Sequence, residues 1–171
     1  MNAPRLYSIS APSWGEDGKG AVLSTTCKRL IDEFSEDDAE KHTLFTGICS
    51  NYLCDLNVGD EVLVSGPAGK RFLLPLDTAA HNYVFVATGT GIAPFRGMVK
   101  ELLEHPDGPC TSEIHLVVGV PYGTDLMYDD LLHSGAPPRA LLSLTGLRKE
   151  SAARDSSEFN VAKHYRAATE A

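Results

Sequence analysis

The sequence predicts an α+β protein in two parts, an antiparallel β-rich part followed by a parallel βαβ part. Short apolar segments broken by Gly, Pro and acidic turns continue to about residue 75, which is typical of a β-rich fold. After Tyr83, two continuous apolar strands enclose an amphipathic helix, which is typical of a parallel sheet. Since 43% of the 171 residues are hydrophobic and 22% are charged, the chain can bury a core.

The first part contains segments with strand-like composition, separated by turn residues. They are residues 5–10, 21–30, 42–48 and 60–66, and a GPAG turn follows the last of them. The charged stretch from Glu33 to His42 is expected to form a solvated loop. Residues 74–82 mix Pro, Ala and polar residues, as a short linker between two domains would.

The second part alternates strands with helices. YVFVAT at 83–88 and IHLVVG at 114–119 predict continuous buried strands, and ALLSLT at 140–145 predicts a third. Residues 94–105 and 125–132 predict the helices between them. The first of these helices places apolar residues on one face at helical spacing: Phe95, Met98, Val99, Leu102 and Leu103.

Charge and composition argue against several classes of protein. The formal net charge of −8 disfavours nucleic acid as a partner. The 4 cysteines lack the spacing of a zinc or other metal site. No apolar run approaches the roughly 20 residues of a membrane-spanning helix, and no secretory signal is evident, so we expect a cytoplasmic protein without membrane insertion.

The strongest local motif is ATGTGIAPFR, residues 87–96, which follows a predicted strand and begins a helix. Gly89 and Gly91 let the backbone approach a ligand closely, and Pro94 suits the first helical turn. The free N–H groups at a helix start favour a pyrophosphate, which the hydroxyls of Thr88 and Thr90 would assist. The alternative is a tight turn without a ligand. The motif lacks the lysine of a P-loop, and its absence disfavours ATP hydrolysis.

Two further segments carry chemical groups that suit a nucleotide cofactor. In RLYS, from Arg5 to Ser8, a guanidinium, an aromatic ring and a hydroxyl lie close together, although an edge strand explains the segment equally well. In GICSNYLCDL, residues 47–56, Ser50 or Asn51 is expected to cap a short helix. We expect Cys49 and Cys54 to be small buried residues rather than redox groups.

Six motifs together resemble, in order and spacing, the plant-type ferredoxin–NADP reductases. They read RLYS, GICSNYLCDL, GDEV, GPAGKRFLLP, ATGTGIAPFRGM and GVPYGTDLMYDDLL. The resemblance runs from about residue 4 to about residue 144, as in a family member truncated at both ends. It implies a partial antiparallel FAD-binding β-barrel over residues 1–76 and an incomplete, Rossmann-like NADP-binding βαβ domain over 77–149. Residues 150–171 are expected to form a poorly ordered or weakly helical tail.

For FAD, the resemblance implies that Arg5 contacts the pyrophosphate, Tyr7 stacks on the isoalloxazine ring and Ser8 lies near its N5 atom. Tyr7 and Ser8 are thus the implied catalytic residues. The other residues implied to contact FAD are Leu6, Thr26, Cys27, Lys28, Ile48, Cys49 and Ser50.

For NADP(H), the resemblance implies contacts from the loop of Gly89, Thr90 and Gly91. Two further residues, Val120 and Pro121, would border the nucleotide. Lys70 and Arg148 would be cationic contacts for its phosphates. Because Leu147 stands where the family usually has a serine, the preference between NADP and NAD stays open.

The implied function is an FAD-dependent oxidoreductase. Hydride would pass between NADP(H) and flavin N5, and single electrons would pass to or from ferredoxin or a flavodoxin-like carrier. Two alternatives stay open: a non-catalytic dinucleotide-binding remnant of such a reductase, and the reductase component of an oxygenase.

Overall fold

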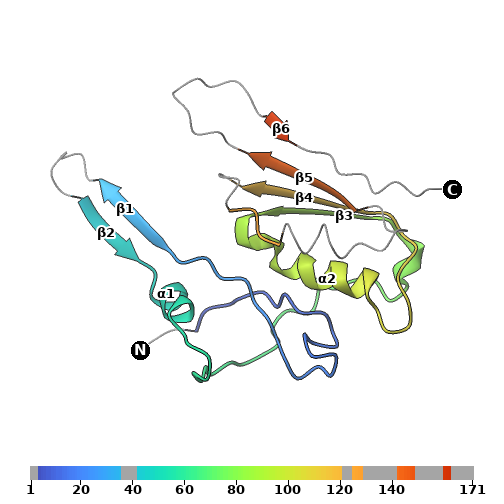
Figure 1. Cartoon of the computed structure of the whole chain (residues 1–171), viewed down its shortest axis with the longest axis horizontal. Coiled ribbons are helices and arrows are strands. Elements are labelled where there is room, and N and C mark those ends of the chain that lie inside the picture. The colour runs from blue at the N-terminus through green and yellow to red at the C-terminus, as the bar shows by residue number, and fades with distance from the viewer. Residues whose placement is uncertain (1–3, 36–41, 121–124, 129–141, 149–159, 163–171) are drawn as a thin grey trace. The chain divides into compact units, whose positions relative to one another are not determined.

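The computed structural model describes residues 4–35, 42–120, 125–128, 142–148 and 160–162 (Figure 1). The chain forms two compact units. The first consists of Met1–Tyr7 and Cys27–Phe72, and the second of Ser8–Thr26 and Leu73–Ala171. The domain boundary expected after residue 76 stays a prediction.

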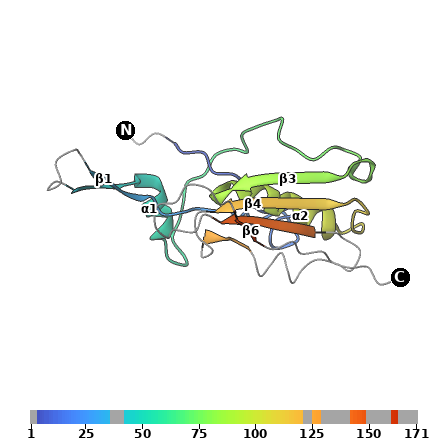
Figure 2. The same ribbon diagram turned by 90° about the horizontal axis from the view of Figure 1, so that it is seen from above.

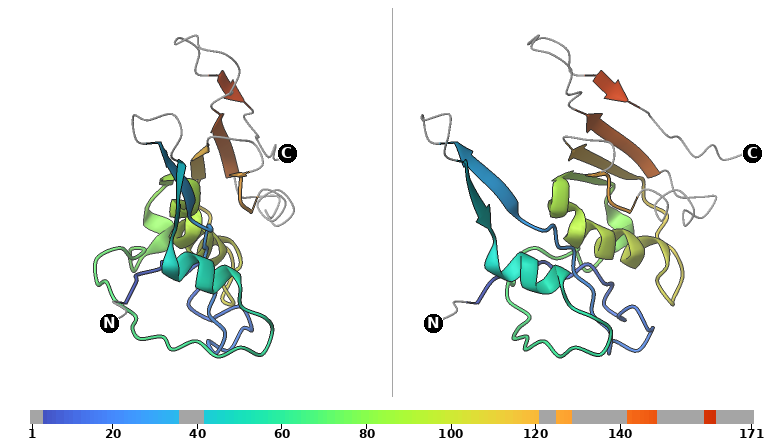
Figure 3. Two further views of the ribbon diagram at one scale, coloured as in Figure 1. Left: turned by 90° about the vertical axis from the view of Figure 1, so that its left-hand side faces the viewer. Right: turned by 60° about the vertical axis from the view of Figure 1, so that its left-hand side comes forward.

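The first unit is built around a β-hairpin and a short helix (Figure 3). Strand β1 (Ile31–Ser35) pairs antiparallel with β2 (His42–Thr46), from Ile31 opposite Thr46 to Ser35 opposite His42. Helix α1 (Ile48–Cys54) follows directly. The expectation of a loop that begins at Glu33 is wrong for its first residues, since β1 continues to Ser35. Residues 36–41 lie outside the described residues.

Three of the expected strands in the first part of the chain are not formed as strands. Residues 5–10 and 21–30 share one isolated antiparallel bridge, Ile9 to Thr25, and 60–66 have no strand assignment. A strand is stabilised by a hydrogen-bonded neighbour and by a face packed on a core. In 60–66 the side chains of Leu63 and Val64 are instead 103% and 79% exposed. The antiparallel barrel stays a prediction.

The second unit contains a four-stranded sheet in the order β3-β4-β5-β6 (Figures 1 and 2). Strands β3 (Tyr83–Thr88), β4 (Ile114–Val120) and β5 (Leu142–Arg148) are parallel, which confirms the predicted parallel sheet. Strand β6 (Asn160–Ala162) pairs antiparallel with β5. It lies in the segment expected to be a poorly ordered or weakly helical tail, and that expectation is wrong for these three residues.

Helix α2 (Ala93–Leu103) lies along one face of this sheet (Figure 1). The predicted apolar stripe is confirmed, since Val99, Leu102 and Leu103 are buried and Phe95 and Met98 pack against the same core. The strand residues of this core are Tyr83, Phe85, Ala87, Ile114, Leu116, Val118 and Val120. Burying such side chains contributes roughly 1.5–3 kcal/mol each, so the core dominates the stability of this unit.

The opposite face of β3 is open in the described residues. Burial alternates along the strand, and Val84 and Val86 are 67% and 66% exposed. The expectation of a continuous buried strand is therefore wrong for β3, because α2 covers only one of its faces.

The connection into β3 is tied to the sheet. It contains a single 3-10 turn, η1 (Thr78–Ala80), which Asp77 caps by accepting from the Ala79 N–H at 3.2 Å. The Thr78 carbonyl accepts from the Tyr83 hydroxyl at 2.7 Å and from the Ser112 hydroxyl at 3.1 Å.

The expectation of a helix at 125–132 is wrong for residues 125–128, the part of this range that the structure describes. Residues 125–128 contain no α-helix, and Tyr128 has φ of 65°. A residue in the left-handed region cannot belong to a right-handed helix. Residues 129–132 lie outside the described residues.

Candidate functional site

The predicted phosphate loop connects β3 to α2. After Thr88, a 3-10 turn, η2 (Gly89–Ile92), leads directly into the helix, and Pro94 lies in the first helical turn as expected. Gly89 has φ of 49°, in the left-handed region, where any residue with a side chain would have a strained backbone. Ile92 and Ala93 are buried, and they anchor the loop in the core.

The space over the two loop glycines is open. A Cβ at Gly89 or at Gly91 would meet no other atom of the described residues within 4 Å. Neither Thr88 nor Ile92, the residues at the N-caps of η2 and α2, makes a side-chain capping hydrogen bond. The first N–H groups of a helix lack partners within the helix, so they can donate to an anion at this position. The residues present therefore fit a pyrophosphate.

The carboxyl ends of the parallel strands lie at the same edge of the sheet as this loop. Thr88 stands opposite Gly119, and Val120, at the end of β4, stands opposite Arg148, at the end of β5. In parallel α/β sheets, ligands bind outside the carboxyl ends of the strands. The backbone thus brings three predicted nucleotide-site segments to one edge, while Pro121 lies outside the described residues.

In the first unit, Tyr7 lies against two thiols. Hydrogen bonding to Cys49, partial burial and the neighbouring Cys27 raise the pKa of the Tyr7 phenol above its usual value. The side chain of Tyr7 is 36% exposed. Three predicted FAD-site residues thus lie together.

Helix α1 is held by hydrogen bonds to the segment before β1. The Ser50 hydroxyl accepts from the Leu30 N–H at 3.1 Å, and Asn51 Nδ2 donates to the Leu30 carbonyl at 2.9 Å. The expectation that Ser50 or Asn51 caps the helix is wrong, since Gly47 is the N-cap and both side chains bond elsewhere. The expectation of a buried Cys54 is also wrong: Cys54 is exposed, and Cys49 is half-buried.

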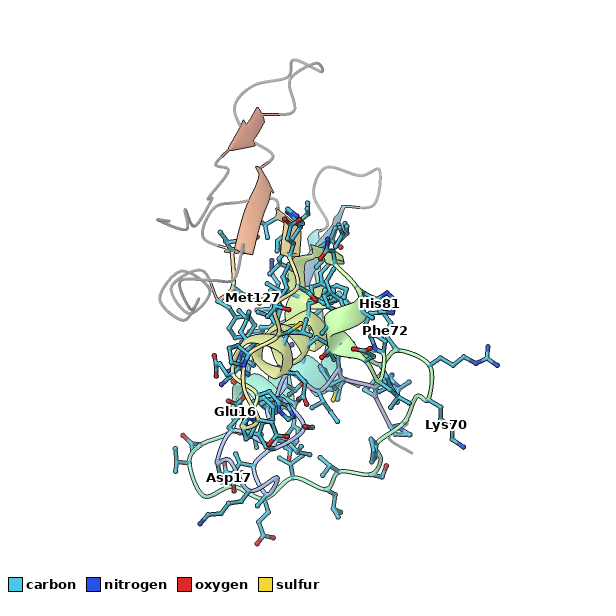
Figure 4. The ribbon with its side chains drawn as sticks, turned by 90° about the vertical axis from the view of Figure 1, so that its right-hand side faces the viewer. Glu16, Asp17, Lys70, Phe72, His81 and Met127 are labelled. Atoms are coloured by element: carbon cyan, nitrogen blue, oxygen red, sulfur yellow. The ribbon has the colours of Figure 1, made fainter. Side chains whose placement is uncertain are left out.

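The other predicted site residues fall in different surroundings. Leu6 and Ile48 are 89% and 80% exposed, and Lys70 extends away from the ribbon in Figure 4. The Thr26 hydroxyl bonds to the hydroxyl of Tyr128 at 2.5 Å, within the second unit. Ser8 is exposed, and its carbonyl accepts from Thr25. Arg5 and Lys28 lie in the first unit.

A charged cluster around Arg96 was not predicted from the sequence. Its guanidinium donates to the Glu16 carboxylate and, at 2.8 Å, to the Ser10 carbonyl, and it lies 5.1 Å from the Tyr128 ring centre. Figure 4 labels Glu16. One sequence signal was available: a cation in the first turn of a helix opposes the helix dipole, so it indicates a nearby anion.

Two classes of site are absent from the part of the chain that the structure describes. No helix there is long and apolar enough to cross a membrane. No group of three or more His, Cys, Asp or Glu side chains among those residues is arranged to hold a metal ion.

A known protein family matches the α/β part of the chain. The family described as the oxidoreductase NAD-binding domain matches residues 85–169, a range that includes the end of β3, the loop, α2, β4 and β5. The match continues beyond the last of the six sequence motifs. Much of the α/β unit is thus similar to the NAD-binding domains of oxidoreductases.

The individual relatives are ferredoxin–NADP reductases. The chain is 41% identical over 130 residues to the cyanelle enzyme of Cyanophora paradoxa, covering 75% of this chain and 34% of that protein. It is 39% identical over 128 residues to chloroplastic leaf isozyme 1 of Arabidopsis thaliana, covering 74% and 34%. It therefore spans about a third of the length of these relatives.

Solved structures agree with the sequence comparison. The ferredoxin-NADP+ reductase of Plasmodium falciparum has a TM-score of 0.61 and 27% identity, covering 82% of this chain and 49% of that one. A mutant of that reductase in complex with 2′P-AMP has a TM-score of 0.59 and 25% identity, covering 82% and 53%. The chain is a relative of the ferredoxin–NADP reductases, and the resemblance inferred from the six motifs is confirmed.

Proposed function

We propose that this chain is part of a ferredoxin–NADP reductase, an FAD-dependent oxidoreductase that exchanges electrons between NADP(H) and a one-electron carrier. The loop from Thr88 to Ile92 carries the proposal. It lies at the carboxyl edge of a parallel sheet and begins a helix, and the space over its glycines is open among the described residues. These are the features that a dinucleotide pyrophosphate requires.

The proposed NADP(H) contacts follow from this edge. Backbone N–H groups from Gly89 to Gly91 would donate to the pyrophosphate, and the Thr90 hydroxyl would assist them. Three more residues are proposed on family resemblance: Val120, Pro121 and Arg148. Lys70 is proposed as a further cation for a phosphate.

The proposed FAD contacts lie mainly in the first unit. The Arg5 guanidinium suits a pyrophosphate, and the half-exposed ring of Tyr7 suits a flavin face. The remaining proposed contacts are Leu6, Ser8, Thr26, Cys27, Lys28, Ile48, Cys49 and Ser50.

FAD, when bound, would supply the chemistry that accepts hydride at N5 and releases electrons one at a time. Tyr7 is proposed to orient the ring, and its position beside Cys49 and Cys27 supports this role. Ser8 is proposed to place its hydroxyl near N5. The electron carrier is proposed to be ferredoxin or a flavodoxin-like protein.

Three finer proposals accompany this function. The first unit would be part of an antiparallel FAD-binding barrel over residues 1–76, and residues 77–149 would form the NADP-binding domain. A cytoplasmic location stays a prediction, and the relatives named above are cyanelle and chloroplastic proteins.

Calorimetry with FAD, NADP+ and 2′P-AMP, each titrated separately, tests the proposal. We expect FAD and NADP+ to bind. The Gly91→Val variant should bind NADP+ at least tenfold more weakly and 2′P-AMP as before, because the new side chain fills the space over the loop and 2′P-AMP carries no pyrophosphate. Gly91 does not have a positive φ, so valine fits its backbone.

The matched control is Ala80→Val. It places the same branched side chain in η1, another 3-10 turn of the same unit, at an exposed position, and it should leave NADP+ affinity unchanged. Absence of both FAD and NADP+ binding would contradict the proposal. Binding of NADP+ alone would favour the non-catalytic remnant.

A further inference from the structure

Three of the four cysteines gather in the first unit. The Sγ atoms of Cys27 and Cys54 lie 3.9 Å apart, and the Cys27 thiol also approaches the Ser50 carbonyl at 3.8 Å. Cys49 lies beside Tyr7, which contacts Cys27 as well. All of these thiols are free. Cys27 and Cys54 are 27 residues apart in sequence, so their proximity is a property of the fold.

A set of polar contacts holds this pair in place. Arg29 forms an ion pair with Asp55 at 2.6 Å and donates to Asn51 at 2.9 Å, and so joins the segment after Cys27 to the end of α1. The backbone around Leu30 adds hydrogen bonds to the same helix. The two sulfurs are thus held close before any reaction, which lowers the entropic cost of joining them.

The two thiols differ in access. Cys54, the last residue of α1, is exposed, whereas Cys27 is half-buried. Burial and the neighbouring Cys54 raise the pKa of the Cys27 thiol. Attack on a disulfide requires a thiolate that the reagent can reach, so Cys54 is the thiol that reacts first.

We propose that Cys27 and Cys54 form a disulfide when the protein meets a low-molecular-weight disulfide such as oxidised glutathione. A disulfide requires the sulfurs to approach to about 2.05 Å from their present separation, a movement within reach of side-chain rotation.

The reaction is an ordinary thiol–disulfide exchange in two steps. Cys54 attacks the small disulfide, whose S–S bond breaks as a mixed disulfide forms and one small thiol leaves. Cys27 then attacks the Cys54 sulfur and displaces the second small thiol. The two cysteines lose two electrons and two protons, and the oxidant becomes two thiols.

The inference goes beyond the proposed function and does not depend on it. The bond would join the end of α1 to Cys27 and change one of the two sulfurs that Tyr7 contacts. Oxidation would therefore alter the surroundings of a proposed flavin contact.

Peptide mapping of the full chain after incubation with excess oxidised glutathione tests the inference. Remaining thiols are blocked at low pH, and the chain is digested with trypsin and chymotrypsin. Trypsin alone leaves Cys49 and Cys54 in one peptide, whereas cleavage after Tyr52 separates them. We expect a peptide ending at Lys28 linked to the one containing Cys54, and the titratable thiols should fall from four to two.

Single serine variants provide controls. Cys49→Ser and Cys110→Ser should retain the linkage, since neither cysteine takes part in it, whereas Cys54→Ser should lose it. A link from Cys49 to either other cysteine, or glutathione adducts without an internal bond, would overturn the inference. The mapping of the unmodified chain decides the matter even if a variant does not fold.

Discussion

Replacing Glu16 by Gln should destabilise the second unit measurably. The Glu16 carboxylate accepts from Arg96 and, at 2.6 Å, from the Ser24 hydroxyl. The side chains of Arg96 and Glu16 are only 12% and 23% exposed. Glutamine keeps the shape of the side chain but leaves the guanidinium without its counter-charge, and unpaired charge away from water is costly.

The size of the effect follows from the acidity of Glu16. Its contacts with Arg96, and to a smaller extent with Ser24 and Lys100, lower its pKa from 4.5 to about 2. Each unit of pKa difference corresponds to about 1.4 kcal/mol, so the interaction is worth about 3.4 kcal/mol at most, and residual solvent access reduces this to about 2–3 kcal/mol. Because the folded-state pKa is depressed, this stability is present above pH 4.5 and is lost as the pH falls towards 2.

Urea unfolding followed by tryptophan fluorescence measures this directly. Trp14, the only tryptophan of the chain, lies in the same unit and contacts the His105 ring. At pH 7 the Glu16→Gln variant should unfold with a free energy about 2–3 kcal/mol lower than the unmodified chain. At pH 3 less than about half of that difference should remain.

The control for this experiment is Glu113→Gln, at a side chain that is 59% exposed, which should change the free energy of unfolding by less than about 0.5 kcal/mol. Equal stability of the Glu16→Gln variant and the unmodified chain at pH 7 would refute the reasoning. So would a difference that stays constant between pH 7 and pH 3, because the carboxylate charge would then not be its source.

Four further variants test the packing of the same unit by the same fluorescence assay. Gly97→Ala should cost more than about 1 kcal/mol despite the helix propensity of alanine, since its Cβ would lie 2.6 Å from the Ala11 carbonyl oxygen; a gain in stability would contradict this contact. Leu116→Ala should cost about 2–5 kcal/mol, because Leu116 is fully buried, and a loss below 1 kcal/mol would contradict its place in the core. Thr26→Val and Tyr128→Phe should each cost about 1 kcal/mol, and their effects should not add, since both remove one hydrogen bond; additive losses would show that the bond is not shared.

The sequence predicted the β3–α2–β4 segment well because its signals are local. The apolar spacing of α2 matches its buried face, and the GTG motif marks the turn that precedes the helix. Parallel pairing with β5 followed from the alternation of strands and helices. The exposed face of β3 was not predicted, because an apolar run in the sequence does not indicate which face of the strand is covered.

The first part of the chain was predicted less well because its strands depend on distant partners. Residues 21–30 and 60–66 have apolar content typical of strands, yet pattern alone cannot supply a hydrogen-bonded neighbour. The thiol pair was missed for the same reason, since Cys27 and Cys54 meet only through the contacts of Arg29 and Leu30 with α1.

The polar face of α2 explains why Ser8–Thr26 belongs to the second unit. An amphipathic pattern is ordinarily taken to mean one face on the core and one in water. Here the second face carries Arg96 and Glu101, which bind Ser10, Glu16 and Ser13, the last through two hydrogen bonds of 2.7 and 2.8 Å. Since Arg96 lies five residues after Gly91, the helix that begins at the phosphate loop also holds the segment that starts with Ser8. The Glu16→Gln variant therefore tests how the segment Ser8–Thr26 is attached to the helix that begins at the proposed phosphate loop, as well as the stability of an ion pair.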